Sequence, residues 1–487
     1  MLSTTYSKLP DRFFERVEPT KVSNPSLIKF NSELAKELNL IKLEKEDLAQ
    51  VFSGNKLLEG SEPLAPAYAG HQFGNFVPQL GDGRAILLGE VIDKNGQWKD
   101  IQLKGSGRTS FSRGGDGRAW LGPVIREYLV SEAMYALGVP TTRSLAAVLA
   151  GEDVYRETVL PGAVLTRVAS SHIRVGTFEY FAARRDDEAV KLLADYVIDR
   201  HYPEIKNSEN QYLDLFLEVG KRQTGLIANW MSLGFIHGVM NTDNTSICGE
   251  TIDYGPCAFM DSFDYHQVFS SIDAQGRYSY SNQANICLWN LSSFANTLIP
   301  LIDDDAQLAV DACNEVLQIL KLDLQNKISV SLLQKIGLEE KTEVNLKLSR
   351  DWLLLLAKYR ADFTMSFRLL SALIKEDSDL TEFLGLFDKT DGRDEELLAW
   401  LVEWRKVLEE QGIERVEQNM NAKNPVFIPR NYLIEEAITQ AHLHNDYSVM
   451  NSLSECFKDP YVYQEEFARF MAVPENKDQA YVTYCGT

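Results

Sequence analysis

The sequence predicts an α+β protein with two lobes, a small antiparallel-sheet lobe followed by a larger helical lobe, and a helical C-terminal extension. Two observations support this prediction: alternating apolar segments bounded by turn residues before residue 110, and Leu-rich helical patterns after about residue 300. Because 487 residues exceed the size of one typical core, we expect three units, at 1–160, 161–300 and 301–487.

The first lobe contains a predicted strand pair and a bounded helix. Residues 84–104 read as two apolar runs, RAILLGEVI and WKDIQLK, around the turn sequence DKNGQ, which is typical of antiparallel strands joined by a short loop. Residues 122–140 have helical spacing, start at a Gly-Pro pair and end at Gly138 and Pro140. We therefore expect a strand, a strand and a helix in that order.

The second lobe is predicted to begin with helices. Residues 211–236 carry apolar side chains at intervals of three and four, which indicates one or two helices ending near Gly234 or Gly238. Short strand-like runs follow at SICGE, TIDYG and CAFMD, within residues 246–261. Beyond residue 300, runs such as DWLLLLAKYRADF and RNYLIEEAITQAHL predict the helical extension.

Composition excludes several classes of function. The net charge is 49 − 70 = −21, which repels nucleic-acid phosphates and anionic lipid. The six cysteines form no C-x-x-C pair, the first residues lack a signal-peptide core, and no run approaches the ~18 apolar residues of a membrane span. We expect a cytoplasmic protein with no nucleic-acid partner and no membrane partner.

Three residues stand in the order found in protein kinases. Lys104 ends a predicted strand, Glu127 lies on the next helix, and Asp253 opens an Asp-Tyr-Gly triplet far downstream. In kinases the strand lysine contacts nucleotide phosphates and pairs with the helix glutamate, while the aspartate of Asp-Phe-Gly holds metal ions. This order favours a protein-kinase-like fold that binds a nucleotide.

A catalytic-loop pattern lies between the helix and this triplet. His237 and Asn244 match the histidine and the metal-binding asparagine of H-R-D-L-x-x-x-N, but Val239 stands at the position of the catalytic aspartate. An ordinary kinase would lose its base by this change. Asp243, next to Asn244, offers a displaced carboxylate for the same purpose.

Glycine-rich segments supply candidates for contacts to phosphate. Gly81, Gly83 and Arg84 precede the first predicted strand, and a second cluster, GGDGRA, lies at 114–119. Taken alone, other conspicuous residues predict less. Arg167 and Arg174 suit an anion but are more commonly ion-paired or exposed, and His71 and His172 lack partners at metal-ligand spacing.

Four longer segments resemble a known family. YAGHQFGNFVPQLGDGRA (68–85), the block at 102–123, the block at 126–145 and HGVMNTDNTSICGETIDYGPCAFMD (237–261) are similar to signature blocks of the selenoprotein O (SelO/YdiU) family of protein adenylyltransferases. The resemblance continues through NPVFIPRNYLIEEAI (424–438) and so covers most of the chain.

The resemblance implies a pseudokinase that binds ATP in a flipped orientation, transfers AMP to Ser, Thr or Tyr hydroxyls of proteins, and releases pyrophosphate. Asp243 would be the catalytic acceptor, Asn244 and Asp253 the Mg²⁺ or Mn²⁺ ligands, and Glu127 the partner of Lys104. The residues that would bind nucleotide are Gly81, Gly83, Arg84, Lys104, Asp116, Gly117, Arg167, Arg174 and Asp253.

The family also implies a redox-active residue at the third position from the C-terminus, which here is Cys485. A disulfide would need a distant partner such as Cys248, Cys257 or Cys287, and a free thiol on a frayed terminus is the alternative.

Three alternative functions share these residues. The scaffold could transfer UMP from UTP, transfer the γ-phosphate, or bind nucleotide without turnover. Val239 argues against ordinary phosphorylation, and Lys104, Glu127, Asn244 and Asp253 together exceed what passive binding needs.

Overall fold

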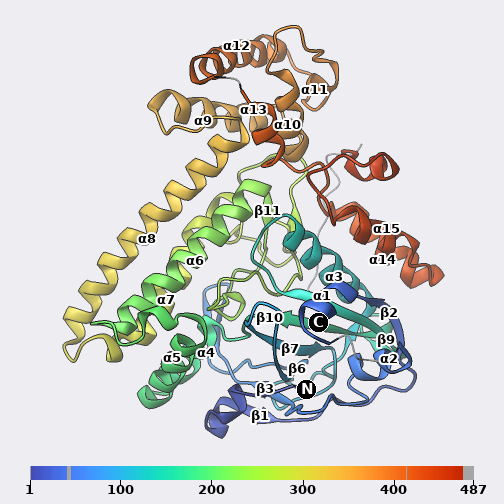
Figure 1. The fold of residues 1–487 in the computed structure, drawn as a ribbon, viewed down its shortest axis with the longest axis vertical. Helices are drawn as coiled ribbons and strands as arrows, with labels where there is room; N and C mark the ends of the chain where they lie inside the picture. Colours follow the sequence, from blue (N-terminus) through green and yellow to red (C-terminus); the bar gives the residue numbers. More distant parts are fainter. Residues whose placement is uncertain (1, 41–44, 413, 475–487) are drawn as a thin grey trace.

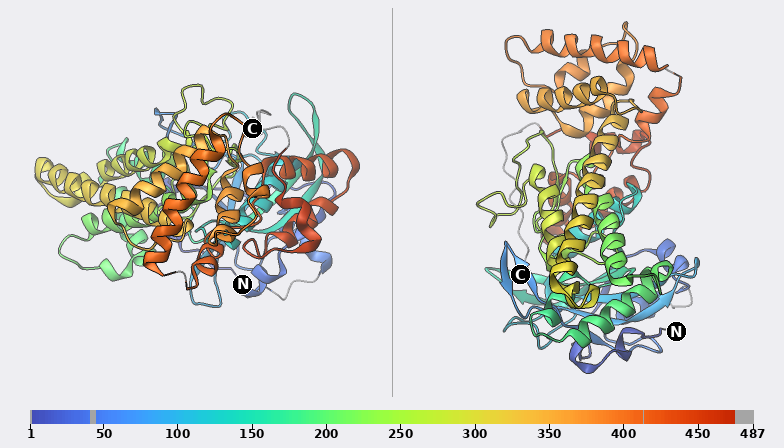
Figure 2. Two further views of the ribbon diagram at one scale, coloured as in Figure 1. Left: turned by 90° about the horizontal axis from the view of Figure 1, so that it is seen from above. Right: turned by 90° about the vertical axis from the view of Figure 1, so that its left-hand side faces the viewer.

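The computed structural model describes residues 2–40, 45–412 and 414–474 and confirms the α+β, kinase-like fold with two lobes and a helical C-terminal region. The sheet lobe lies at one end of an elongated molecule, and helices α9 to α13 form the other end (Figures 1 and 2). The boundaries predicted near residues 160 and 300 stay predictions; residue 160 lies in strand β10 and residue 300 in helix α7.

One antiparallel sheet forms the body of the first lobe. Its strands, in spatial order, are β1 (Phe14–Arg16), β3 (Leu64–Pro66), β6 (Ala85–Ile92), β7 (Trp98–Lys104), β10 (Val159–Ala169), β9 (Arg143–Tyr155) and β2 (Ser26–Phe30), with β8 (Ala119–Trp120) also paired to β10. The predicted strand pair is confirmed as β6 and β7, with Ala85 opposite Lys104. This register places Lys104 at the strand end that faces the second lobe.

Helices cover both faces of this sheet. The predicted helix is confirmed as α3 (Leu121–Ala136), which packs against β9 and β10. Two short helices, α1 (Ser32–Glu37) and α2 (Lys45–Phe52), contribute to an apolar core with side chains of β6, β7, β9 and β10. The position of Glu127 on α3 is therefore set by a buried helix.

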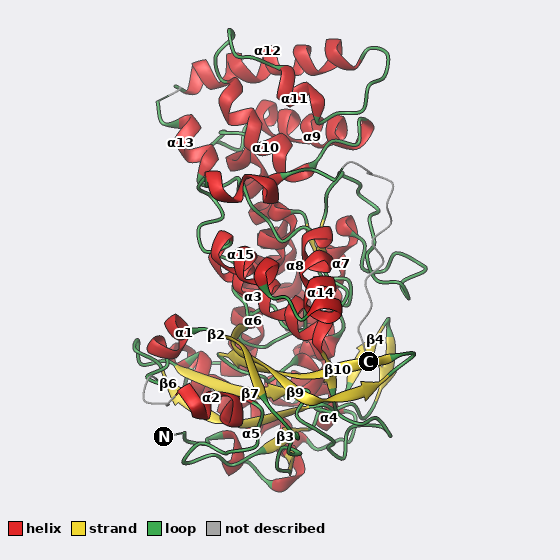
Figure 3. Ribbon diagram, turned by 90° about the vertical axis from the view of Figure 1, so that its right-hand side faces the viewer, coloured by secondary structure: helices red, strands yellow, loops and turns green. Residues whose placement is uncertain are grey.

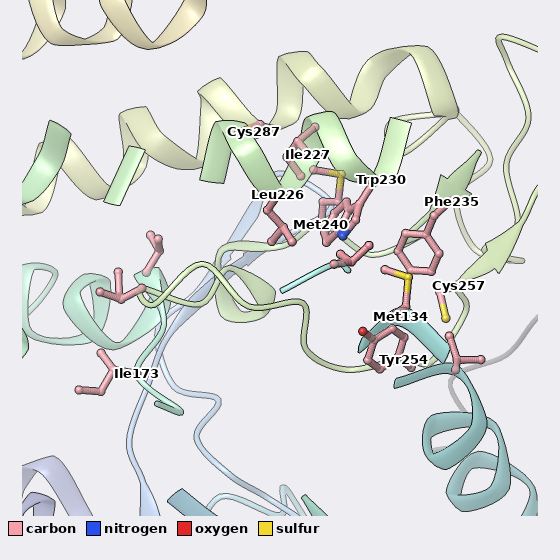
Figure 4. Close-up of a cluster of buried hydrophobic side chains, with 14 of the residues drawn as sticks. Met134, Ile173, Leu226, Ile227, Trp230, Phe235, Met240, Tyr254, Cys257 and Cys287 are labelled. Atoms are coloured by element: carbon pink, nitrogen blue, oxygen red, sulfur yellow. The ribbon is translucent and has the colours of Figure 1, made fainter. Parts of the chain in front are cut away.

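The second lobe is built from long helices. They are α4 (Val175–Ala182), α5 (Asp187–His201), α6 (Gln211–Leu233), α7 (Gln283–Ile302) and α8 (Ala306–Lys335). Of the one or two helices predicted for 211–236, the structure has one, α6, which ends at Leu233 and is capped by Gly234, the first of the two predicted end points. Figure 4 shows Leu226, Ile227 and Trp230 of α6 beside Met240 of the catalytic loop, which anchors that loop to the core.

The prediction of three strand-like runs at 246–261 is wrong for two of them. In the third run, Ala258–Phe259 forms β12, which pairs with β11 (Phe235–Ile236). The other runs make single hydrogen bonds to neighbouring segments, such as Ile247 N–H to the carbonyl of Ile173, and only isolated bridges at Ser246 and Thr251. The β-branched residues there are buried among helices and loops, which accounts for their strand-like composition.

The C-terminal helices pack in two places. Helices α9 (Glu343–Lys358), α10 (Phe363–Leu370), α11 (Thr381–Gly385), α12 (Arg393–Gln411) and α13 (Val416–Asn421) share a core around Trp352, Trp400 and Trp404. Helices α14 (Asn431–His444) and α15 (Ser448–Cys456) instead return to the sheet lobe and pack on α3 (Figure 3).

Lys335, at the end of α8, is buried against aromatic rings. Its Nζ lies 4.4 Å from the ring centroid of Phe367 and 5.5 Å from that of Phe363, and none of the described carboxylates pairs with it. Burial lowers the pKa of Lys335 from 10.5 to about 7. The charged form is therefore disfavoured in the folded protein.

Replacing Lys335 by Met is expected to stabilise the protein near neutral pH. Between pH 7 and 10.5 Lys335 is protonated in the unfolded chain but neutral in the folded protein, so the free energy of unfolding of the wild type should rise with pH, by up to about 1.4 kcal/mol per pH unit. Below pH 7 the buried Lys335 is charged, and the wild type is destabilised by the full cost of desolvating that charge. Thermal midpoints of both proteins at pH 6 and pH 9.5 test this. The Met variant should be more stable at pH 6, and the difference should narrow at pH 9.5. Lys321→Met, on an exposed position of the same helix, should show neither effect.

Candidate active site

A cleft of about 730 Å³ lies between the sheet lobe and the catalytic loop. It brings together predicted residues from seven separate stretches of the chain. Those that line it are Gly81, Gly83, Arg84, Lys104, Asp116, Gly117, Arg167, Arg174, Asp243, Asn244 and Asp253. Glu127 lies behind Lys104, and Cys485 lies outside the described residues, so its redox role stays a prediction.

The cleft carries a positive charge although the molecule as a whole is negative. Seven lining residues are basic and four are acidic, although the chain as a whole carries −21. The basic residues are Arg84, Lys104, Arg113, Arg118, Arg156, Arg167 and Arg174. An excess of one sign of charge in a cleft concentrates ligands of the opposite sign, so the basic excess here favours an anionic ligand such as a polyphosphate.

A buried ion-pair array forms the floor of the cleft. Lys104 Nζ lies 2.7 Å from Glu127 Oε2 and 2.8 Å from Asp253 Oδ1. Arg167 Nε donates to Glu127 Oε1 at 2.7 Å, and Arg167 Nη2 lies 3.8 Å from Asp253 Oδ1. The strand lysine, the α3 glutamate and the triplet aspartate thus meet as the kinase-like order predicts.

The array keeps its carboxylates ionised. Burial alone would raise the pKa of Asp253, but Lys104 and Arg167 outweigh it and hold that pKa well below its usual range. The same balance holds for Glu127: burial alone would raise its pKa, but Arg167 and Lys104 outweigh burial, so the pKa of Glu127 is lowered. Asp253 has a left-handed backbone, with φ of 67°, a conformation that Asp tolerates better than most residues.

Residues 237–244, the predicted catalytic loop, are organised around His237. His237 is buried, its Nδ1 accepts a hydrogen bond from Val239 N–H at 3.3 Å, and its Nε2 donates to the carbonyl of Ile252 at 2.8 Å. Burial lowers the pKa of His237, so the ring is neutral. The Val239 side chain lies in the cleft lining at the position where a kinase has its base.

Asp243 provides a carboxylate in the same cleft. Its Oδ2 accepts a hydrogen bond from Gln72 Nε2 at 3.1 Å, while its Oδ1 is buried without a hydrogen-bond partner. Burial raises the pKa of Asp243 to about 6, partly opposed by Gln72 and Arg174. An oxygen of this kind can accept a proton or bind a cation.

Arg167 and Arg174, for which the sequence motifs alone gave only a weak prediction of anion binding, are buried in the wall of the cleft. Arg167 and Arg174 are 3% and 5% exposed. Arg174 donates to the backbone carbonyl of Asp243 at 2.8 Å, pairs with Asp82 at 3.3 Å, and lies over the ring of Tyr68. These contacts fix its guanidinium near the catalytic loop.

Two of the predicted nucleotide-binding residues also have structural roles: Gly81 in packing and Asp116 in an ion pair. Gly81 has φ of 70°, and a Cβ there would lie 2.2 Å from the Phe111 ring, so this position needs glycine whether or not phosphate binds. Asp116 lies at the rim and pairs with Arg156 at 2.8 Å, a hydrogen bond that lowers the pKa of Asp116.

The predicted metal ligands fit a hard divalent cation. Asn244 Nδ2 donates to the carbonyl of Val239 at 3.1 Å, which leaves its amide oxygen free to bind a cation, and Asp253 adds carboxylate oxygens. Within the described ranges no cluster of three His, Cys, Asp or Glu groups forms a metal cage. Mg²⁺ typically uses one or two carboxylates together with substrate phosphates and water, which suits this donor set.

Residues outside the predicted set also belong to the site. Asp82 accepts from Gln102 Nε2 at 2.7 Å, Gln102 Oε1 accepts from Arg167 at 3.3 Å, and Gln72 contacts Asp243. All three lie in blocks that resemble the family, Gln72 and Asp82 in 68–85 and Gln102 in 102–123, but no motif within those blocks singled them out. The two histidines have carboxylate partners: His71 makes a hydrogen bond with Glu179, and His172 makes one with Asp100.

None of the described helices is long and apolar enough to cross a membrane. The described cysteines, at 248, 257, 287, 313 and 456, are buried and form no disulfide with one another.

Comparison with known proteins identifies the family. Residues 1–458 match a family model described as "Protein adenylyltransferase SelO". A protein of Rhizobium johnstonii named "Protein nucleotidyltransferase YdiU" is 52% identical over 486 residues, covering 99% of this chain and 96% of the relative. A protein of Agrobacterium fabrum with the same name is 51% identical over 487 residues, covering 99% of both chains. The chain therefore belongs to the SelO family and is a nucleotidyltransferase.

Proposed function

We propose that this enzyme transfers AMP from ATP to Ser, Thr or Tyr hydroxyls of other proteins, in the presence of Mg²⁺ or Mn²⁺. The observation that carries the proposal is the unpartnered Asp243 Oδ1 in a basic cleft where Val239 replaces the usual base. The description of the matching family as adenylyltransferases supports ATP as the co-substrate.

In the proposed reaction, the acceptor oxygen attacks the α-phosphorus. A P–O bond to the acceptor forms, the bond between the α-phosphorus and the bridging oxygen breaks, and pyrophosphate leaves. The hydroxyl proton passes to the Asp243 carboxylate. Lys104, Arg167 and Arg174 neutralise phosphate charge, and their buried partners hold them in place before the substrate arrives.

A bound divalent cation would supply further charge neutralisation on the phosphates. Asn244 and Asp253 are the residues that would hold it. Asp253 bonds Lys104 in the structure, so the same carboxylate would orient both the cation and the lysine.

Intact-mass analysis of a generic acceptor protein after incubation with ATP and Mg²⁺ or Mn²⁺ tests the proposal. We expect the acceptor to gain the mass of AMP with wild-type enzyme and to gain nothing with Asp253→Ala, because the variant loses a metal ligand and the partner of Lys104. A gain of phosphate would contradict the proposal. Parallel reactions with UTP identify the preferred nucleotide, and faster transfer of UMP than of AMP would replace ATP by UTP in the proposal.

A further inference from the structure

A short segment crosses directly over the catalytic loop. Residues 69–73, which we call the strap, contain strand β4 (Gly70–Gln72), paired with β5 (Asn75–Val77). Each hydrogen bond that joins the strap to the loop uses a different loop residue: His71 N–H to Thr242 Oγ1 at 2.7 Å, Gln72 Nε2 to Asp243 Oδ2 at 3.1 Å, and Phe73 N–H to Asn241 Oδ1 at 3.2 Å.

The strap also lies against Asp243 sterically. A Cβ on Gly70 would stand 2.3 Å from Asp243 Oδ1, so the backbone of the strap passes as close to this carboxylate as glycine permits. Gln72 and Phe73 line the nucleotide cleft. Asp243 is thus held by a hydrogen bond at one oxygen and by close packing beside the other.

The strap itself is firmly anchored. His71 Nδ1 lies 2.6 Å from Glu179 Oε1, on helix α4, and the Thr242 hydroxyl donates to Glu179 Oε2. Glu179 is 5% exposed, and Ala69 N–H donates to the carbonyl of Gly176 at the start of the same helix. Strap and catalytic loop therefore share one buried support, which fixes Gln72 relative to Asp243.

We propose that Gln72 is a positioning residue for nucleotidyl transfer, whose amide holds Asp243 Oδ2 and so fixes the orientation of the Asp243 carboxylate in the cleft. This inference rests on the proposed role of Asp243. A carboxylate turns easily about its terminal torsion, and either oxygen could otherwise point into the cleft. Fixing the carboxylate in one orientation keeps it aligned with the attacking group, and catalysis is sensitive to misplacement of about 1 Å.

Replacing Gln72 by Met tests the inference, because Met preserves length but donates no hydrogen bond. We expect kcat for transfer to a protein acceptor to fall about 10- to 100-fold. The KM for ATP and the thermal midpoint should change little, because the hydrogen bond that the substitution removes is the one from the Gln72 amide to Asp243. Gln72→Glu, which replaces the donor by an acceptor, should lower kcat at least as much.

Asn75→Met is the matched control, since Asn75 lies in the same hairpin, is exposed, and pairs with Gln72 across the turn. Wild-type kcat in Gln72→Met would overturn the inference, as would a change confined to the KM for ATP or an equal loss of kcat in Asn75→Met. If wild type transfers UMP or phosphate, the proposed function fails, but the same comparison of kcat still tests Gln72. A wild type that transfers nothing would overturn both.

Discussion

Asp243→Asn is expected to lower kcat for AMP transfer by about 10²- to 10⁴-fold, the usual contribution of a general base. The amide keeps the shape of the side chain and can still accept the Gln72 hydrogen bond, but it cannot take the acceptor proton. ATP affinity, measured by calorimetry, should be preserved, because in the proposed binding mode Lys104 and the arginines hold the phosphates.

The comparison variant is Asp116→Asn, which weakens the rim ion pair with Arg156. We expect it to act mainly on the KM for ATP and to leave kcat near the wild-type value. If Asp243→Asn turned over at the wild-type rate, another group would have to accept the proton. Complete loss of transfer with intact ATP binding would exclude a scaffold without turnover.

Arg430→Met is expected to lower the free energy of unfolding by about 3–5 kcal/mol, more than any other substitution considered, because it leaves the carboxylates of Asp261 and Asp362 without their partner. Arg430 is 1% exposed, pairs with Asp261, and makes two hydrogen bonds to Asp362, at 2.7 and 3.2 Å. Asp362 also caps α10 by accepting from Met365 N–H at 2.7 Å. Urea unfolding monitored by circular dichroism at pH 7 measures the loss.

The loss of stability in Arg430→Met should become smaller as the pH falls. Burial raises the pKa of Asp261 even though Arg430 opposes the shift, and removing Arg430 should raise it further. A carboxyl group with a raised folded-state pKa contributes less stability as pH rises above its unfolded pKa of 3.8, so stability returns as pH falls. Arg469→Met, which removes the exposed pair with Glu436, should cost no more than about 1 kcal/mol. An equal loss in both variants would show that desolvation is not the cause.

Local patterns predicted the elements that carry the site. The alternation around DKNGQ identified β6 and β7, and helical spacing identified α3 and α6, because these elements bury one side of a regular period. Lys104, Glu127 and Asp253 were identifiable because their order along the chain follows from the connectivity of the fold.

Other features depend on contacts that a period cannot encode. The runs SICGE and TIDYG are apolar because they are buried between helices, not because they pair in a ladder. Arg167 and Arg174 resembled ordinary surface arginines until the fold placed carboxylates beside them. Gln72 contacts a residue 171 positions away, so no local spacing connects the two.

The return of α14 and α15 to the sheet lobe bears on how the enzyme is controlled. In protein kinases, moving the helix that carries the glutamate breaks its pair with the strand lysine and silences the enzyme. Here α3 is held from behind: Arg126 on α3 pairs with Glu435 on α14, and the Tyr461 hydroxyl donates to the carbonyl of Leu137 at 3.0 Å. An outward swing of α3 would have to dislodge the C-terminal helices as well. The C-terminal part of the chain thus helps to hold α3, and with it the pair between Lys104 and Glu127, in place.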